Sequence, residues 1–94
     1  MHRLELSRKA VRSMRRIPKN RVEQIFESLE ELTVLDDPTS HHNVKSMRGN
    51  WAGHYRMRIA AYRAIFVLNA DSENRSNQLL LISVVAVGSR GDAY

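Results

Sequence analysis

The 94-residue sequence has no cysteine and no long apolar run. The lack of cysteine excludes disulfide frameworks and thiolate-held zinc or iron–sulfur sites, and it weakly favours a cytoplasmic location. No window approaches eighteen uninterrupted apolar residues, which excludes a transmembrane helix. The first six residues alternate polar and apolar and lack the apolar core of a signal peptide. The length predicts one small globular domain spanning residues 1–94.

Acidic residues are also in deficit. Fifteen lysines and arginines stand against ten acids, which gives a formal net charge of +5. Lys9, Lys19 and Lys45 are the only lysines, so arginine dominates. The planar guanidinium group suits phosphate and keeps its charge when it is partly buried. A polyanion is therefore one candidate partner, and a merely well-solvated basic surface is the alternative.

The N-terminal part predicts a short strand followed by two helices. Residues 2–6 alternate as a strand, and Ser7 is suited to cap a helix that Pro18 ends. The next helix begins near Asn20, and its apolar positions fall at i, i+3, i+4, i+7 and i+10 from Val22.

The charges of these helices are segregated along the chain. Residues 1–21 hold eight basic residues and one acid, whereas residues 22–37 hold six acids and no base. We therefore expect an antiparallel helical hairpin with ion pairs across it. The expected partners are Arg12, Arg15 and Arg16 with Glu27, Glu30 and Glu31.

The apolar period changes to two from His54 onward, which predicts strands. The first such strand places Tyr55, Met57 and Ile59 on one face and His54, Arg56 and Arg58 on the other. Residues 62–68 predict a second strand after a turn at 60–61, and the apolar run 79–87 predicts a strand buried on both faces. The expected fold class is α+β, in the order β-α-α-β-β-β. In this fold the helical hairpin packs on one face of a small, mostly antiparallel sheet and leaves the other face partly open.

The open face carries the candidate chemistry. The sequence has no Gly-rich phosphate loop and no paired carboxylates, and the adjacent His41 and His42 have no acidic neighbour in the sequence, so we predict no metal. Clustered basic side chains are suited to clamp a phosphodiester and to stabilise charge that develops on its nonbridging oxygens. The candidates are His54, Arg56, Arg58, Arg63, Arg90 and Tyr94. The alternative is that these arginines only solubilise an exposed sheet face.

Three segments in order resemble one family. Residues 47–59 (MRGNWAGHYRMRI) resemble the pattern L-x-G followed by Y-R-x-R, and residues 61–66 (AYRAIF) resemble x-Y-R-x-x-Y. Residues 87–94 (VGSRGDAY) resemble the closing x-G-x-R-x-x-x-Y. With the basic helical segment ahead of them, the three resemble the RelE/ParE toxin superfamily over nearly the whole chain.

The resemblance implies the RelE-like fold and a toxin of a bacterial or archaeal type II toxin–antitoxin pair. RelE-like members cut mRNA in the ribosomal A site without a metal or other cofactor. The ribose 2′-hydroxyl attacks the adjacent phosphate and leaves a 2′,3′-cyclic phosphate and a free 5′-hydroxyl. The implied partners are a cognate antitoxin, the ribosome and mRNA, with operator DNA bound only through the antitoxin and no membrane.

The resemblance also implies residue roles. Arg56 and Arg58 occupy places where RelE-like toxins have basic residues at the scissile phosphate, and Arg63 matches the phosphate-stabilising arginine of the next strand. Arg90 and Tyr94 match the C-terminal arginine and the tyrosine that stacks on or orients the nucleotide. The expected RNA-binding set is Lys45, Arg48 and His54.

One departure from the family leaves the proton acceptor open. The type member has lysines at the places of Arg56 and Arg58, and a lysine can act as a general base where an arginine cannot. His54 is one candidate base, and catalysis by charge stabilisation and alignment alone is the other reading. The alternative function is a ParE-like inhibitor of DNA gyrase without nuclease activity, and an inactive relative is a third reading.

Overall fold

The computed structural model describes residues 1–72 and 79–89. The described residues form two α-helices, two short 3₁₀ turns and five strands. In chain order these are β1 (Arg3–Leu6), α1 (Arg8–Met14), α2 (Lys19–Thr33), η1 (Pro38–Ser40), β2 (Val44–Ser46), η2 (Gly49–Trp51), β3 (Tyr55–Ile59), β4 (Tyr62–Ala70) and β5 (Leu80–Ser89).

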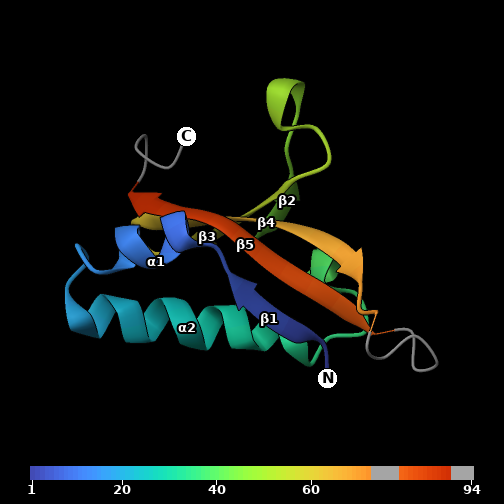
Figure 1. The fold of residues 1–94 in the computed structure, drawn as a ribbon, viewed down its shortest axis with the longest axis horizontal. Helices are drawn as coiled ribbons and strands as arrows, with labels where there is room; N and C mark the ends of the chain where they lie inside the picture. The colour runs from blue at the N-terminus through green and yellow to red at the C-terminus, as the bar shows by residue number, and fades with distance from the viewer. Residues whose placement is uncertain (73–78, 90–94) are drawn as a thin grey trace.

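The strands form one sheet in the order β1-β5-β4-β3-β2 (Figure 1). β1 pairs with β5 in parallel, and the other three neighbouring pairs are antiparallel. The expected α+β fold with a mostly antiparallel sheet is therefore confirmed. The sequence does not predict β2. This strand has only three residues, two of which are exposed, so it shows no apolar alternation.

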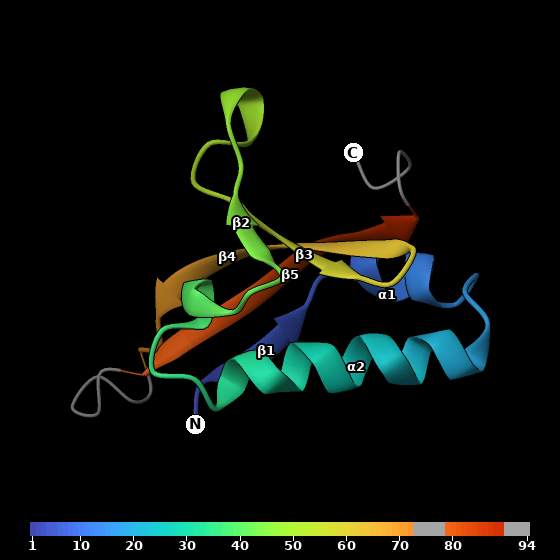
Figure 2. The same ribbon diagram turned by 180° about the vertical axis from the view of Figure 1, so that it is seen from behind.

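Both helices lie on the same face of the sheet, as expected (Figures 1 and 2). The hydroxyl of Ser7 caps α1, because it accepts a hydrogen bond from the N–H of Ala10 at 3.1 Å. The same hydroxyl donates to the carbonyl of Val85 at 2.9 Å, which ties the start of α1 to β5. α1 ends at Met14, and Pro18 stands at the N-cap of α2.

The apolar stripe of α2 packs on the sheet. Ile25, Leu29 and Leu32 are fully buried, and Val22 packs against the same core. Phe26 belongs to the predicted stripe but stays 36% exposed, because it lies at the rim that faces α1. None of the described helices has the length and apolar character needed to cross a membrane.

The predicted ion pairs between α1 and α2 are wrong. Within the described part of the chain, no guanidinium nitrogen of Arg12, Arg15 or Arg16 lies within 4.0 Å of a carboxylate oxygen of an α2 glutamate. Glu31 pairs instead with His41, with 2.8 Å between Oε2 and Nε2. The reason is geometric: α1 packs mainly on β5 and α2 on β1 and β3, so the charged faces of both helices point to solvent.

The sheet has two unequal apolar faces. The main core lies between the helices and the sheet, around Phe66, Met57 and Ile82. On the opposite face Ile65 and Ala86 form a small cluster, against which three partly buried side chains pack. These are Met47, Trp51 and Val85. The segment between β2 and β3 that carries η2 projects away from the helices in both views (Figures 1 and 2).

Candidate functional site

Four basic side chains share the sheet face opposite the helices, and the strand register brings them together. Lys45 on β2 is the register partner of Arg56 on β3, and Arg58 on β3 is the partner of Arg63 on β4. Met57, which lies between the two β3 arginines, is buried in the main core. Because successive side chains of a strand point to opposite faces, Arg56 and Arg58 point away from the helices.

These four side chains line a cavity of about 210 Å³. The segment before β2 adds His42 and Asn43 to the same wall. Asn43 is held there because its carbonyl oxygen accepts the N–H of Arg58 at 3.0 Å, which extends the pairing of β2 with β3. We call this set the basic pocket: His42, Asn43, Lys45, Arg56, Arg58 and Arg63.

The basic pocket is suited to an anion. Its described lining holds three guanidiniums and one ammonium but no carboxylate. Like charges held this close repel one another, and a bound anion relieves that repulsion. Guanidinium groups form paired, charge-assisted hydrogen bonds to phosphate oxygens, so a phosphodiester is the ligand class that fits this chemistry.

Two members of the expected RNA-binding set lie outside the basic pocket. Arg48 is exposed at the start of η2. His54 packs edge-on against Trp51, with 5.0 Å between ring centroids, and its buried Nδ1 atom has no hydrogen-bond partner among the described residues. His54 precedes β3 and so lies outside the strand in which it was expected, and the first β3 side chain that lines the pocket is Arg56.

Arg90 and Tyr94 lie outside the described residues. β5 ends at Ser89, and Gly88 is the register partner of Arg63. The roles of both residues stay predictions.

His42 and Asn43 are pocket residues that sequence reasoning missed. In the sequence His41 and His42 suggest only metal ligation, and the residues after them show no strand pattern. The available signal was the apolar Val44 between Asn43 and Lys45, which is buried as the first residue of β2. Among the described residues, no three His, Asp or Glu side chains are grouped so that they could hold a metal ion.

A second surface feature is an apolar groove between the helices. It has a volume of about 330 Å³, and its apolar lining includes Val11 and Phe26, which are 38% and 36% exposed. We call it the helical groove: Leu6, Val11, Met14, Arg15, Ile17, Lys19, Val22 and Phe26. An adjoining hollow adds Arg8 and Arg12 to its rim. The described rim is therefore basic and holds no acid.

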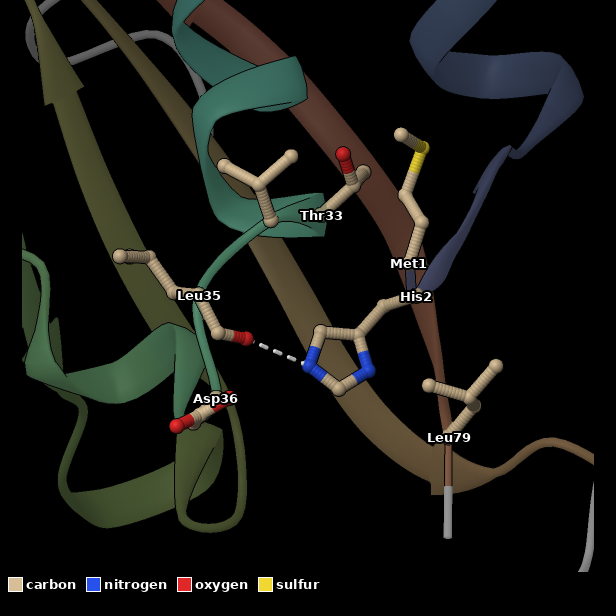
Figure 3. A pocket seen from close by; sticks show the side chains of 7 residues that line it. Met1, His2, Thr33, Leu35, Asp36 and Leu79 are labelled. Carbon is tan, nitrogen blue, oxygen red and sulfur yellow. Dashed lines mark hydrogen bonds between the residues drawn. The ribbon is translucent and has the colours of Figure 1, made fainter. Parts of the chain in front are cut away.

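A larger cavity of about 570 Å³ lies where β1, the end of α2 and the start of β5 meet (Figure 3). His2 is buried at this point and joins all three elements. Its backbone N–H donates to the carbonyl of Thr33 at 2.8 Å, and its Nδ1 accepts the N–H of Leu80 at 3.0 Å. Since Nδ1 accepts, Nε2 carries the proton and donates to the carbonyl of Leu35 at 2.7 Å. With both ring nitrogens engaged by backbone, His2 has a structural role.

The fold and the basic pocket define a class of protein: two helices on one face of a five-stranded mixed sheet, with a pocket lined by basic side chains on the other face. No protein-family model and no curated protein sequence matches the chain. Solved structures match it over nearly its full length. The toxin–antitoxin complex RelBE2 of Mycobacterium tuberculosis is 20% identical with a TM-score of 0.72, covering 97% of this chain and 93% of that chain.

Two further matches agree with the first. The archaeal RelE–RelB complex of Pyrococcus horikoshii is 21% identical with a TM-score of 0.67, covering 98% of both chains. The intact RelBE toxin–antitoxin complex of E. coli is 20% identical with a TM-score of 0.67, covering 96% of this chain and 98% of that chain. The protein thus has the RelE-like fold, as the sequence resemblance implies.

Proposed function

We propose that this protein is the toxin of a type II toxin–antitoxin system and that it cleaves mRNA in the ribosomal A site in the cytoplasm. The observation that supports this proposal most directly is the basic pocket. The sheet register places Lys45 beside Arg56 and Arg58 beside Arg63, with no carboxylate in the described lining. Such a set has the charge that a scissile phosphodiester requires, and mRNA supplies one.

The proposed reaction needs no metal or other cofactor. The 2′-oxygen of a ribose forms a bond to the adjacent phosphorus, and the bond from phosphorus to the 5′-oxygen of the next nucleotide breaks. The 2′-hydroxyl gives up its proton, and the leaving 5′-oxygen takes one up. The pocket arginines stabilise the extra negative charge that the nonbridging oxygens carry in the transition state.

The proposal is tested by inducing the wild type beside Arg58→Ala and mapping the 5′ ends of ribosome-associated mRNA. Arg21→Ala is a matched control, because Arg21 is exposed on α2 and, within residues 1–72 and 79–89, its side chain bonds only to Gln24 of the same helix. We expect cuts aligned with the reading frame in the wild type and the Arg21 variant, and at least about a 100-fold loss in Arg58→Ala.

Each other result has a defined meaning. Growth arrest without cuts contradicts the nuclease proposal and favours gyrase inhibition, which a supercoiling assay then measures. An Arg58→Ala variant that folds and cuts like the wild type removes Arg58 from the site. Absence of both arrest and cuts indicates an inactive relative.

We further propose that the antitoxin seats an acidic amphipathic helix in the helical groove. The supporting observations are the exposed apolar side chains of Val11 and Phe26 and the basic rim, whose Arg12 and Arg15 form no ion pair with α2. A helix with one apolar and one acidic face complements both features. Operator DNA is then bound through the antitoxin.

The antitoxin proposal is tested with the product of the neighbouring gene. Phe26→Glu is expected to weaken binding by at least about tenfold, because it places a carboxylate in the apolar groove. Val34→Glu is the matched control, since Val34 is 67% exposed at the end of α2 and does not line the groove. Equal weakening by both variants, or by neither, contradicts this placement.

A further inference from the structure

The basic pocket lacks an obvious proton acceptor among its cations. An arginine side chain stays protonated in proteins, so Arg56, Arg58 and Arg63 cannot accept the 2′-hydroxyl proton. Lys45 is the one ammonium in the described lining, and in its charged form it has no lone pair with which to accept a proton. His42 is the one imidazole in the described lining. Histidine changes its charge between about pH 5 and 8 and commonly acts as a general base.

A rigid neighbour positions His42. Its ring stacks on that of His41, with 4.6 Å between centroids and 15° between ring planes. The His41 side chain is 8% exposed, whereas His42 is exposed at the mouth of the pocket. The stack therefore orients a solvent-accessible ring against a buried one.

His41 is itself held by hydrogen bonds at both nitrogens. Its Nδ1 accepts the N–H of Asn43 at 3.1 Å, so Nε2 carries the proton and donates to Oε2 of Glu31 at 2.8 Å. The Glu31 side chain, which is 60% exposed, thus holds the His41 ring from the nitrogen opposite Asn43.

We propose that His42 is the general base of the cleavage reaction and that His41 is a positioning residue that acts through it. This inference rests on the proposed nuclease function and adds the missing proton acceptor. An imidazole nitrogen of His42 takes the proton of the 2′-hydroxyl as the bond from the 2′-oxygen to phosphorus forms and the bond from phosphorus to the 5′-oxygen breaks. The leaving oxygen is protonated from water. The charged groups that share the pocket lining with His42 are Lys45, Arg56, Arg58 and Arg63, and the His41 ring stacked on it is paired with Glu31.

The test measures single-turnover cleavage of a programmed ribosome by the purified protein between about pH 5 and 8.5. We expect the wild-type rate to rise with pH through the range in which histidine titrates. His42→Ala should fold normally and bind the ribosome, but its rate should fall by about 10²- to 10⁴-fold and lose this pH dependence. Added imidazole should restore part of the rate of His42→Ala and leave that of Arg58→Ala unchanged.

Two more variants separate catalysis from structure. His41→Phe keeps an aromatic ring under His42 but removes both hydrogen bonds, so we expect the pH profile to shift with a smaller loss of rate. Ser40→Ala is the local control, because Ser40 is exposed in the same segment and does not line the pocket. It should keep both the rate and the pH profile.

The outcomes distinguish the two proposals. A wild type that leaves programmed ribosomes uncut contradicts the nuclease function itself. A wild type that cuts, beside a His42→Ala variant with the same rate and pH profile, overturns only the assignment of His42. A His42→Ala variant that is slow but keeps the wild-type pH profile and gains nothing from imidazole overturns it as well.

Discussion

Neutralising Arg58 tests whether the basic pocket is electrostatically strained in the free protein. Arg58 is the register partner of Arg63, and Lys45 and Arg56 form the next pair along the strands. Like charges directly opposite each other destabilise a sheet by about 0.2–1 kcal/mol. Arg58→Thr removes this repulsion and introduces a residue that favours strands, so the free energy of unfolding should rise by about 0.5 kcal/mol at low salt.

The expected gain is measurable by thermal unfolding. For a domain of this size about 1 kcal/mol corresponds to about 4–8 °C, so Arg58→Thr should raise Tm by about 2–4 °C. Arg58→Lys keeps the charge and should show no such gain. The difference should be present at about 0.01 M salt and vanish at about 1 M, where the screening length falls from about 30 Å to about 3 Å. mRNA cleavage by Arg58→Thr should be lost although the fold is more stable.

The effect of inorganic phosphate on Tm is a second test of the same charge repulsion in the basic pocket. It should raise the Tm of the wild type more than that of Arg58→Thr, because a ligand that binds the folded state stabilises it according to its occupancy. A low-salt Tm for Arg58→Thr at or below that of the wild type refutes the reasoning. A gain that does not depend on salt refutes it too, since strand propensity alone would then explain it.

Three further predictions concern stability. Ala60 has a left-handed backbone with φ of 53°, so Ala60→Gly should stabilise the β3–β4 turn by about 0.5–1 kcal/mol. Ala61→Gly should destabilise the turn, and chemical unfolding of both variants measures the sign of each change. His2→Ala leaves partly buried backbone groups of Leu35 and Leu80 without partners and should cost about 1–3 kcal/mol in the same assay. Hydrogen bonds from the hydroxyl and, to a smaller extent, the backbone N–H of Thr39 lower the pKa of Asp37. This carboxylate therefore contributes stability above its unfolded-state pKa, and the contribution is lost as pH falls through the folded-state pKa. An acid titration of stability for Asp37→Asn should lack that loss, and an unchanged acid limb would contradict it.

Local rules predicted most of the fold. Ser7 caps the first helix through a hydroxyl that needs only the next turn, and periodicity alone predicts the buried positions Ile25, Leu29 and Leu32. The alternation through Arg56 and Arg58 gave the correct face for both side chains. These features depend on neighbours within one or two turns, or on the period of a strand.

Features that depend on distant contacts were not predictable in the same way. The ion pairs expected between the helices failed, because helix orientation is decided by packing on the sheet and not by charge. β2 forms by pairing with the edge strand β3, and its three residues are too few to show a strand pattern in the sequence. Because the sequence does not predict β2, it does not place His42 beside the pocket arginines. The arginines themselves are predicted as a set.

The interior position of β5 in the sheet has a consequence for how the chain folds. Arg3 of β1 pairs with Leu81, and β5 also supplies the partner of β4, so residues 80–89 join the N-terminal strand to the rest of the sheet. Pairing of segments so distant in the sequence is slow, because a large loop must close before the contact is gained. On a translating ribosome β1 and both helices emerge first, and their apolar faces have no complete sheet to cover until β5 has been made. During that interval the apolar faces of α1 and α2 are open to any binding partner that is already present.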